Sequence, residues 1–199
     1  MSNPNYSIFL IAGILSAKSY IVNHHAIITK LVIDSRSVID PDESLFFALN
    51  ATRNGHEYLK DAYVNGIKNF VISDENYIKS FPDANVLLVA DVLAALQTLA
   101  KYNREHHTLK TIAITGSNGK TIVKEWLYQL LAADFNIVRS PKSFNSQIGV
   151  PLSVWEIEEN HTMGIFEAGI SKSGEMDSLA EIIQPTIGIL TNIGEAHAE

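Results

Sequence analysis

The chain has 199 residues, 46% of them hydrophobic, which is enough for one large or two small domains with a core. The net charge of −7 argues against a nucleic-acid partner, because proteins that bind nucleic acid normally present a basic field. The absence of cysteine excludes disulfides, thiolate nucleophiles and Cys-ligated zinc, and is compatible with a cytoplasmic location. The apolar run at residues 8–15 follows no basic residue and is too short to cross a bilayer, so we expect no membrane insertion.

The first half of the chain alternates between predicted helices and strands, which is typical of an α/β fold. Apolar periodicity predicts a domain over residues 1–107, with a linker at 105–109. Asn65-Gly66 is expected to end the helix that precedes it, as a C-cap does. In this half we predict helices at 6–20, 56–64 and 91–104, and strands at 26–34, 45–49, 70–72 and 86–89.

The second half predicts another α/β domain, over residues 108–199, with a mainly parallel sheet. Four strands are fewer than the five or six usual in doubly wound sheets, so we expect this domain to be incomplete. Here we predict strands at 112–114, 137–138, 163–166 and 186–193, and helices after residue 120, at 152–155 and at 175–183.

A glycine-containing turn joins the strand at 112–114 to the helix that follows, and it reads T-G-S-N-G-K-T. Glycines let backbone N–H groups approach phosphate oxygens, and the helix start adds unpaired N–H groups and partial positive charge. Ile114 replaces the first glycine of the common phosphate-loop pattern, so this loop is a shorter variant. We predict ATP binding by Thr115, Gly116, Ser117, Asn118, Gly119, Lys120 and Thr121 of this loop and by Asn192.

Polar residues follow two other predicted strands of the second domain. Glu167 ends one strand, and Asn192 and His197 flank the end of another. Ligands of open α/β sheets bind at the carboxyl ends of the strands, so these side chains are expected beside the phosphate loop. A carboxylate suits Mg²⁺, which prefers hard oxygen ligands. We therefore predict that Glu167 is a magnesium ligand.

Four motifs carry a resemblance to the Mur ligase family, which builds the peptide stem of peptidoglycan. The loop T-G-S-N-G-K-T resembles its ATP loop, and residues 184–199, with T-N-I-G-E-A-H, resemble a second family motif. The segments D-S-R-S-V and N-G-H-E-Y resemble the family's UDP-sugar domain, which folylpolyglutamate synthase lacks although its loop is similar. The implied fold is a small UDP-sugar-binding α/β domain followed by a partial ATP-binding P-loop domain.

The resemblance also implies roles for individual residues. Catalysis is expected to depend on Lys120, Glu167 and His197, and Mg²⁺ on Thr121, Glu167 and His197. The UDP-linked substrate is expected at residues Ser35, Arg36, Thr52 and Arg53, where Arg36 or Arg53 contacts the uridine nucleotide. The segment S-F-N-S-Q-I-G-V-P resembles the loop of members that add D-alanyl-D-alanine, with Ser143 in place of its first Asn. This places the second substrate at Asn145 and Ser146.

The implied reaction joins D-alanyl-D-alanine to UDP-N-acetylmuramoyl-tripeptide through an acyl phosphate and forms ADP. The family also carries a carbamoylated lysine and a C-terminal domain outside these residues, so we expect residues 1–199 alone to be inactive. The sequence of residues 140–151 also resembles that of a bifunctional family member fused to a C-terminal alanine racemase. Two alternatives stay open: a Mur ligase that adds the third, diamino acid residue, and a nucleotide-binding switch protein without ligase activity. A guanine-specificity motif N-K-x-D would favour the switch protein, and the chain has none.

Overall fold

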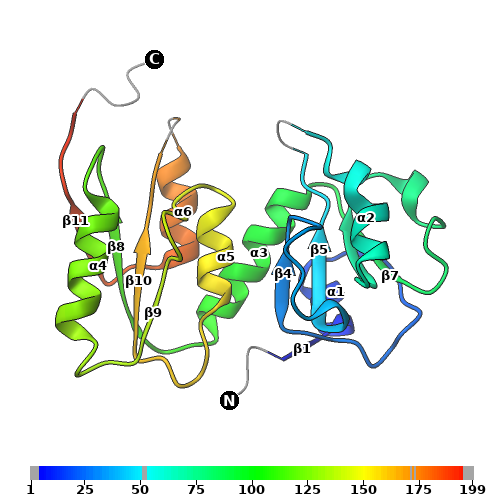
Figure 1. Ribbon diagram of the computed structural model, residues 1–199, viewed down its shortest axis with the longest axis horizontal. Helices are drawn as coiled ribbons and strands as arrows, with labels where there is room; N and C mark the ends of the chain where they lie inside the picture. Colours follow the sequence, from blue (N-terminus) through cyan, green and yellow to red (C-terminus); the bar gives the residue numbers. More distant parts are fainter. Residues whose placement is uncertain (1–4, 51–52, 171, 173, 195–199) are drawn as a thin grey trace. The chain divides into compact units, whose positions relative to one another are not determined.

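The computed structural model describes residues 5–50, 53–170, 172 and 174–194 (Figure 1). The chain forms two compact units, one ending at Leu99 and the next beginning at Ala100. This division lies inside a helix, whereas the sequence motifs place the domain boundary after residue 107, which stays a prediction. The α/β class with mainly parallel sheets is confirmed in both units.

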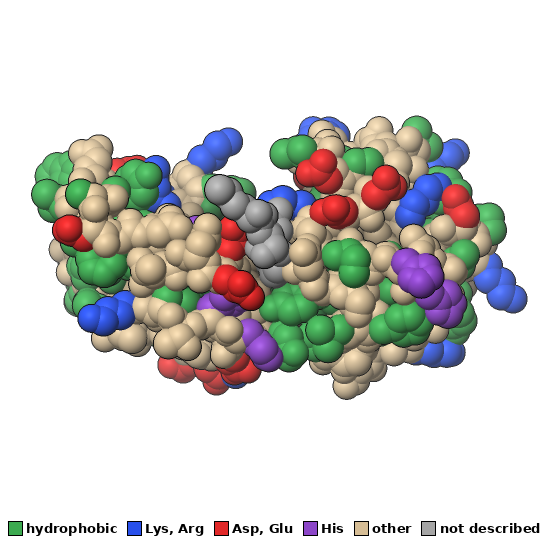
Figure 2. Space-filling view, turned by 90° about the horizontal axis from the view of Figure 1, so that it is seen from below, with side chains coloured by type: hydrophobic (Ala, Val, Ile, Leu, Met, Phe, Trp, Pro, Cys, Tyr) green, Lys and Arg blue, Asp and Glu red, His purple; other side chains and the backbone are tan. Residues whose placement is uncertain are grey.

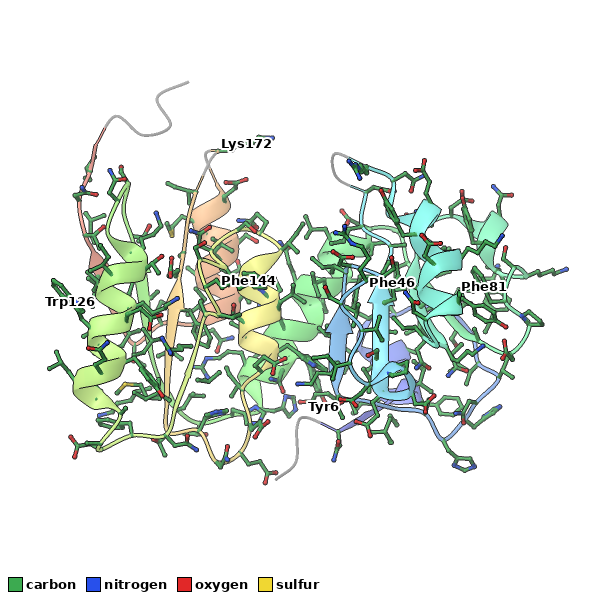
Figure 3. All side chains as sticks on the ribbon, viewed as in Figure 1. Tyr6, Phe46, Phe81, Trp126, Phe144 and Lys172 are labelled. Carbon is green, nitrogen blue, oxygen red and sulfur yellow. The ribbon has the colours of Figure 1, made fainter. Side chains whose placement is uncertain are left out.

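The first unit is built on a five-stranded sheet of order β2-β7-β6-β5-β4. Strands β4 to β7 run parallel, and β2 pairs with β7 in the antiparallel direction. Phe46 of β5 packs with Phe70 and Phe81 in the core, under the helix α2 (Figure 3). Its elements are β1 (Tyr6–Ser7), α1 (Ile8–Ile14), β2 (Lys18–Tyr20), β3 (Ile27–Ile28), β4 (Lys30–Val32), η1 (Pro41–Glu43), β5 (Ser44–Phe47), η2 (Gly55–Tyr58), α2 (Leu59–Val64), β6 (Asn69–Ile72), η3 (Glu75–Tyr77), β7 (Asn85–Leu88) and the start of α3 (Val92–Glu105).

Two elements of the first unit differ from the prediction. The helix predicted over residues 6–20 ends at Ile14, because Ser16 adopts a left-handed φ of 48° and residues 18–20 pair with β7 instead. The strand predicted over residues 26–34 is divided at Thr29. The Thr29 N–H and hydroxyl donate to Glu43, so β3 and β4 join different sheets.

The second unit is built on a four-stranded parallel sheet of order β11-β8-β10-β9. Ile112, Ile114 and Ile165 face α4, whereas Ala113 and Phe166 face α5 and α6, as the alternation of a strand requires. Figure 1 shows the helices on the two sides of this sheet. Its elements are β8 (Lys110–Thr115), α4 (Lys120–Leu131), β9 (Ile137–Arg139), α5 (Gly149–Trp155), β10 (Met163–Glu167), α6 (Glu175–Ile183) and β11 (Ile187–Leu190).

The sheet of the second unit brings three chain segments to one edge. Glu167 pairs in register with Ile114, and Leu190 pairs with Thr115. The carboxyl ends of β8, β10 and β11 therefore lie side by side, and each is followed by a segment with predicted site residues. The last strand was predicted over 186–193 but ends at Leu190, because the residues after it bond to the loop beyond β8.

Candidate active site

The predicted phosphate loop connects β8 to α4. Gly119 stands at the N-cap of α4 with a φ of 85°, and no side chain caps the helix there. The first turn of α4 also holds no acidic residue. The N–H groups of this turn have no partners within the helix, and the helix dipole adds partial positive charge. The N-terminus of α4 is thus suited to bind an anionic phosphate.

The segment after β11 holds this loop in place. The N–H groups of Ser117 and Asn118 donate to the backbone oxygen and the side-chain Oδ1 of Asn192, over 3.1 and 2.9 Å. The Thr191 hydroxyl donates to Asn118 O over 2.5 Å, and the Gly194 N–H donates to Ser117 Oγ over 3.0 Å. Asn192 therefore fixes the shape of the loop by accepting hydrogen bonds from two N–H groups of the loop.

Lys120 is the first residue of α4, and its ammonium reaches back over the loop. Its Nζ donates to Gly116 O over 2.5 Å. The side chain is partly exposed, so the ammonium needs only rotations about its own bonds to reach a phosphate bound at the helix start.

Glu167 is the centre of the site. It ends β10 with its side chain fully buried, and its Oε2 accepts a hydrogen bond from the Thr121 hydroxyl over 3.0 Å. Its other oxygen, Oε1, lies 2.9 Å from Lys124 Nζ. The sequence predicted Glu167 and Thr121 as joint metal ligands, and the fold brings them together.

The donors at this position fit a magnesium ion. Although the Lys124 ammonium is close to Glu167 Oε1, no donor among the described residues makes a hydrogen bond to that buried oxygen. The carboxylate and the Thr121 hydroxyl are hard oxygen donors, which Mg²⁺ prefers. In the part of the chain that the structure describes, no cluster of three or more His, Asp or Glu side chains could hold a metal. Mg²⁺ usually keeps several waters and binds substrate phosphates, so two protein oxygens at this position suit such a site.

Lys124 is a residue of the site that the sequence analysis missed. It occupies the inner face of α4, four residues after Lys120, and its side chain is completely buried. A lysine is almost never fully buried unless it is paired. Its spacing from Leu127 and Leu131, three and seven residues further along the predicted helix, was the available signal, but its partners lie 16 and 43 residues further along the chain.

Asn145 and Ser146, which are predicted to bind the second substrate, D-alanyl-D-alanine, lie on the segment between β9 and α5. Asn145 O accepts a hydrogen bond from Gly169 N over 2.7 Å, two residues after Glu167. Ser146 Oγ accepts from the N–H of Gly149, at the start of α5. The fold thus places Asn145 close to the chain that follows the buried carboxylate, and gives Ser146 a structural bond.

The residues predicted to bind the UDP-linked substrate belong to the other unit. Ser35 is buried and its carbonyl accepts from Asn65 Nδ2 over 2.7 Å. Arg36 donates to both oxygens of Asp34, and these hydrogen bonds lower the pKa of Asp34 to about 2. Arg53 donates to Tyr58 Oη over 3.2 Å, and this hydrogen bond raises the pKa of Arg53. The charge of Arg36 acts on this pKa in the opposite direction.

Two predicted site residues, Thr52 and His197, lie outside the described residues. Their assignments stay predictions, as does the role of each residue above in binding. No helix among the described residues is long and apolar enough to cross a membrane. On the face drawn in Figure 2, Lys and Arg side chains are scattered and form no broad basic surface, which agrees with the negative net charge.

Comparison with known proteins matches the phosphate loop and the strands around it to one family. The Mur ligase middle domain matches residues 114–199. UDP-N-acetylmuramoyl-tripeptide–D-alanyl-D-alanine ligase of Borreliella burgdorferi is 37% identical over 188 residues, which cover 90% of this chain and 40% of that protein. The chain belongs to the Mur ligase family.

Solved structures of Mur ligases share the fold of both units. MurF from Acinetobacter baumannii matches with a TM-score of 0.88 and 27% identity, over 99% of this chain and 43% of that one. The MurF ligase from Thermotoga maritima, solved in complex with ADP, matches with a TM-score of 0.74 and 27% identity, over 85% and 39%. The chain thus spans about 40% of the length of the Mur ligases that it matches.

Proposed function

We propose that the protein containing this chain is an ADP-forming ligase of peptidoglycan synthesis that joins D-alanyl-D-alanine to UDP-N-acetylmuramoyl-tripeptide. One observation carries the proposal: a buried carboxylate, Glu167, bonded to the Thr121 hydroxyl directly beside a phosphate loop. The matched relatives named for this reaction supply the substrates.

In the proposed reaction, the terminal carboxylate of the tripeptide attacks the γ-phosphorus of ATP, and ADP leaves. The amine of D-alanyl-D-alanine then attacks the resulting acyl phosphate, displaces phosphate and forms the amide. The main catalytic demand is the alignment and neutralisation of charge at the γ-phosphate. Lys120 meets this demand when its ammonium exchanges Gly116 O for phosphate oxygens, and the N–H groups at the start of α4 hold the phosphates.

A magnesium ion would be held by Glu167 and Thr121, with His197 as a further proposed ligand. Such an ion supplies positive charge to the phosphate oxygens. Asn192 shapes the nucleotide loop, and the uridine nucleotide of the UDP-linked substrate is assigned to Arg36 or Arg53.

The remaining substrate assignments follow the motifs. Ser35 and Thr52 belong with the uridine nucleotide, and Asn145 and Ser146 with D-alanyl-D-alanine. The cytoplasmic location, the inactivity of residues 1–199 alone and a fused alanine racemase stay predictions.

Phosphate release by the full-length protein tests the proposal. The assay contains ATP, Mg²⁺ and two acceptors, UDP-N-acetylmuramoyl-tripeptide and D-alanyl-D-alanine. Each acceptor is omitted in turn. We expect release only when both acceptors are present. Release with the UDP-dipeptide precursor and a diamino acid would assign the preceding step, and release without any acceptor would favour a nucleotide-dependent switch.

A further inference from the structure

Lys124 is a buried cation to which the proposed reaction gives no role. Its Nζ donates to Ser140 O over 2.8 Å and to Lys142 O, and it lies 2.9 Å from Glu167 Oε1. Glu125 Oε1 is a more distant neighbour, at 3.4 Å. Two of the three N–H groups of the ammonium donate to carbonyls, and the charge of the nearby Glu167 carboxylate offsets the charge of the ammonium. Burial of such a cation is tolerated only where its partners are arranged to compensate it.

The partners of Lys124 belong to two parts of the candidate site. Glu167 is the proposed magnesium carboxylate, whereas Ser140 and Lys142 begin the segment that leads to Asn145. Lys142 has a φ of 50°, a left-handed conformation that residues other than glycine rarely adopt, and its carbonyl is bonded to the ammonium. The Glu167 N–H also donates to Ser140 Oγ over 3.1 Å, which ties the two parts together a second time.

We propose that Lys124 is a positioning residue that holds the Glu167 carboxylate and the segment 140–146 in one arrangement. The Lys124 ammonium thereby fixes the orientation of the Glu167 carboxylate. It also fixes the start of the segment 140–146 relative to the nucleotide loop. Its contacts stop the carboxylate from turning away from Thr121 before magnesium and nucleotide bind. This inference rests on the proposed function, because it assigns Glu167 to magnesium.

The test measures ADP binding to the full-length protein by calorimetry, once with Mg²⁺ and once with EDTA. The variant is Lys124→Met, which keeps the length of the side chain and removes its charge. The matched control is Lys101→Met, which removes an exposed lysine paired with Glu181 at 3.0 Å. We expect Lys124→Met to reduce the Mg²⁺-dependent gain in ADP affinity by about 10–100-fold, the usual effect of removing a group that orients a metal ligand. ADP affinity in EDTA should stay at the parent value.

Lys124→Arg is a second variant, for use if Lys124→Met fails to fold, because it keeps the buried charge. A guanidinium is larger and planar, so it cannot occupy the same place between Glu167 and the two carbonyls. We expect this variant also to lose most of the Mg²⁺-dependent gain, and kcat for phosphate release to fall in parallel. Parent-like Mg²⁺ dependence in either folded variant overturns the inference, as does an equal loss of ADP affinity with Mg²⁺ and with EDTA. A parent protein without Mg²⁺-dependent ADP binding would instead overturn the proposed function.

Discussion

Gly116 has no room for a side chain. Its φ of 126° is unfavourable for any residue with a Cβ, and a Cβ there would collide with Thr191 Oγ1 and lie 2.8 Å from Asn192 O. Because these atoms hold the nucleotide loop, a substitution at Gly116 changes the loop's shape as well as its stability.

We therefore expect Gly116→Ala to destabilise the protein by at least about 2 kcal/mol, from backbone strain and overpacking together. ADP binding should be lost in the protein that remains folded. The control is Gly188→Ala in β11, where, chain neighbours apart, the described residues place nothing within 4 Å of the added Cβ. Urea denaturation and calorimetry with ADP measure both effects. Equal behaviour of the two variants would show that the contacts of Gly116 are unimportant.

The Asp34–Arg36 pair predicts a pH dependence. The pKa of Asp34 is lowered from 3.8 to about 2 by hydrogen bonds from Arg36, so the pair favours the folded state above the ordinary carboxyl pKa. This contribution is lost as the pH falls through about 2. We expect an NMR titration of the Asp34 carboxyl to give a midpoint near that value, and Arg36→Gln to return it toward 3.8. An unchanged midpoint in the variant would contradict the assignment.

At single positions, the sequence predicted the residues whose chemistry is set by a local pattern. The loop at 115–121 was recognisable because strand, glycine turn and helix follow one another in the chain. Thr121 and Glu167 were also predicted as magnesium ligands, Glu167 from its place at the end of a strand and both through the family resemblance. The role of Lys124 was not predictable, because its partners become neighbours only when β10 pairs beside β8. Asn192 was predicted to bind ATP, and the structure adds its bonds to the loop itself.

Among the helices and strands, the last turn of α3 is bonded to neighbouring segments of the second unit by a buried arginine. Arg104 donates to Ile183 O over 2.8 Å and to His107 O over 2.9 Å, with longer contacts to Leu109 O and Gln184 O. Burial lowers its pKa, but an arginine stays charged. The side chain therefore satisfies carbonyls at the ends of several elements with a single group.

We expect Arg104→Ala to lower the free energy of unfolding by at least about 3 kcal/mol, because it leaves buried carbonyls without donors. Lys101→Ala on the same helix removes only an exposed ion pair and should cost about 1 kcal/mol or less. Urea denaturation of both variants checks the difference. A similar cost for both would mean that solvent replaces the bonds of Arg104.

The errors in predicted elements have a common cause. The helix predicted over 6–20 and the strand predicted over 186–193 both contain enough apolar residues for their full length. Each ends early because the following residues bond to a segment distant in sequence: residues 18–20 to β7, and residues 191–194 to the nucleotide loop. Periodicity reports which residues face a core, but it contains no information about such partners.

For the protein as a whole, the two units separate the proposed tasks. The nucleotide, metal and acceptor residues lie in the second unit, and the residues assigned to the uridine nucleotide lie in the first. In the proposed reaction, the tripeptide's terminal carboxylate attacks phosphorus, so the bond between this oxygen and its new phosphoryl group must form before D-alanyl-D-alanine reacts.

Isotope transfer measures this step directly. The full-length protein is given UDP-N-acetylmuramoyl-tripeptide labelled with ¹⁸O in its terminal carboxylate, together with ATP, Mg²⁺ and D-alanyl-D-alanine. Mass spectrometry then follows the released phosphate and the peptide product. We expect one ¹⁸O atom in each phosphate released, because the bridging carboxylate oxygen of the acyl phosphate leaves with the phosphoryl group. Unlabelled phosphate accompanying amide formation would contradict it.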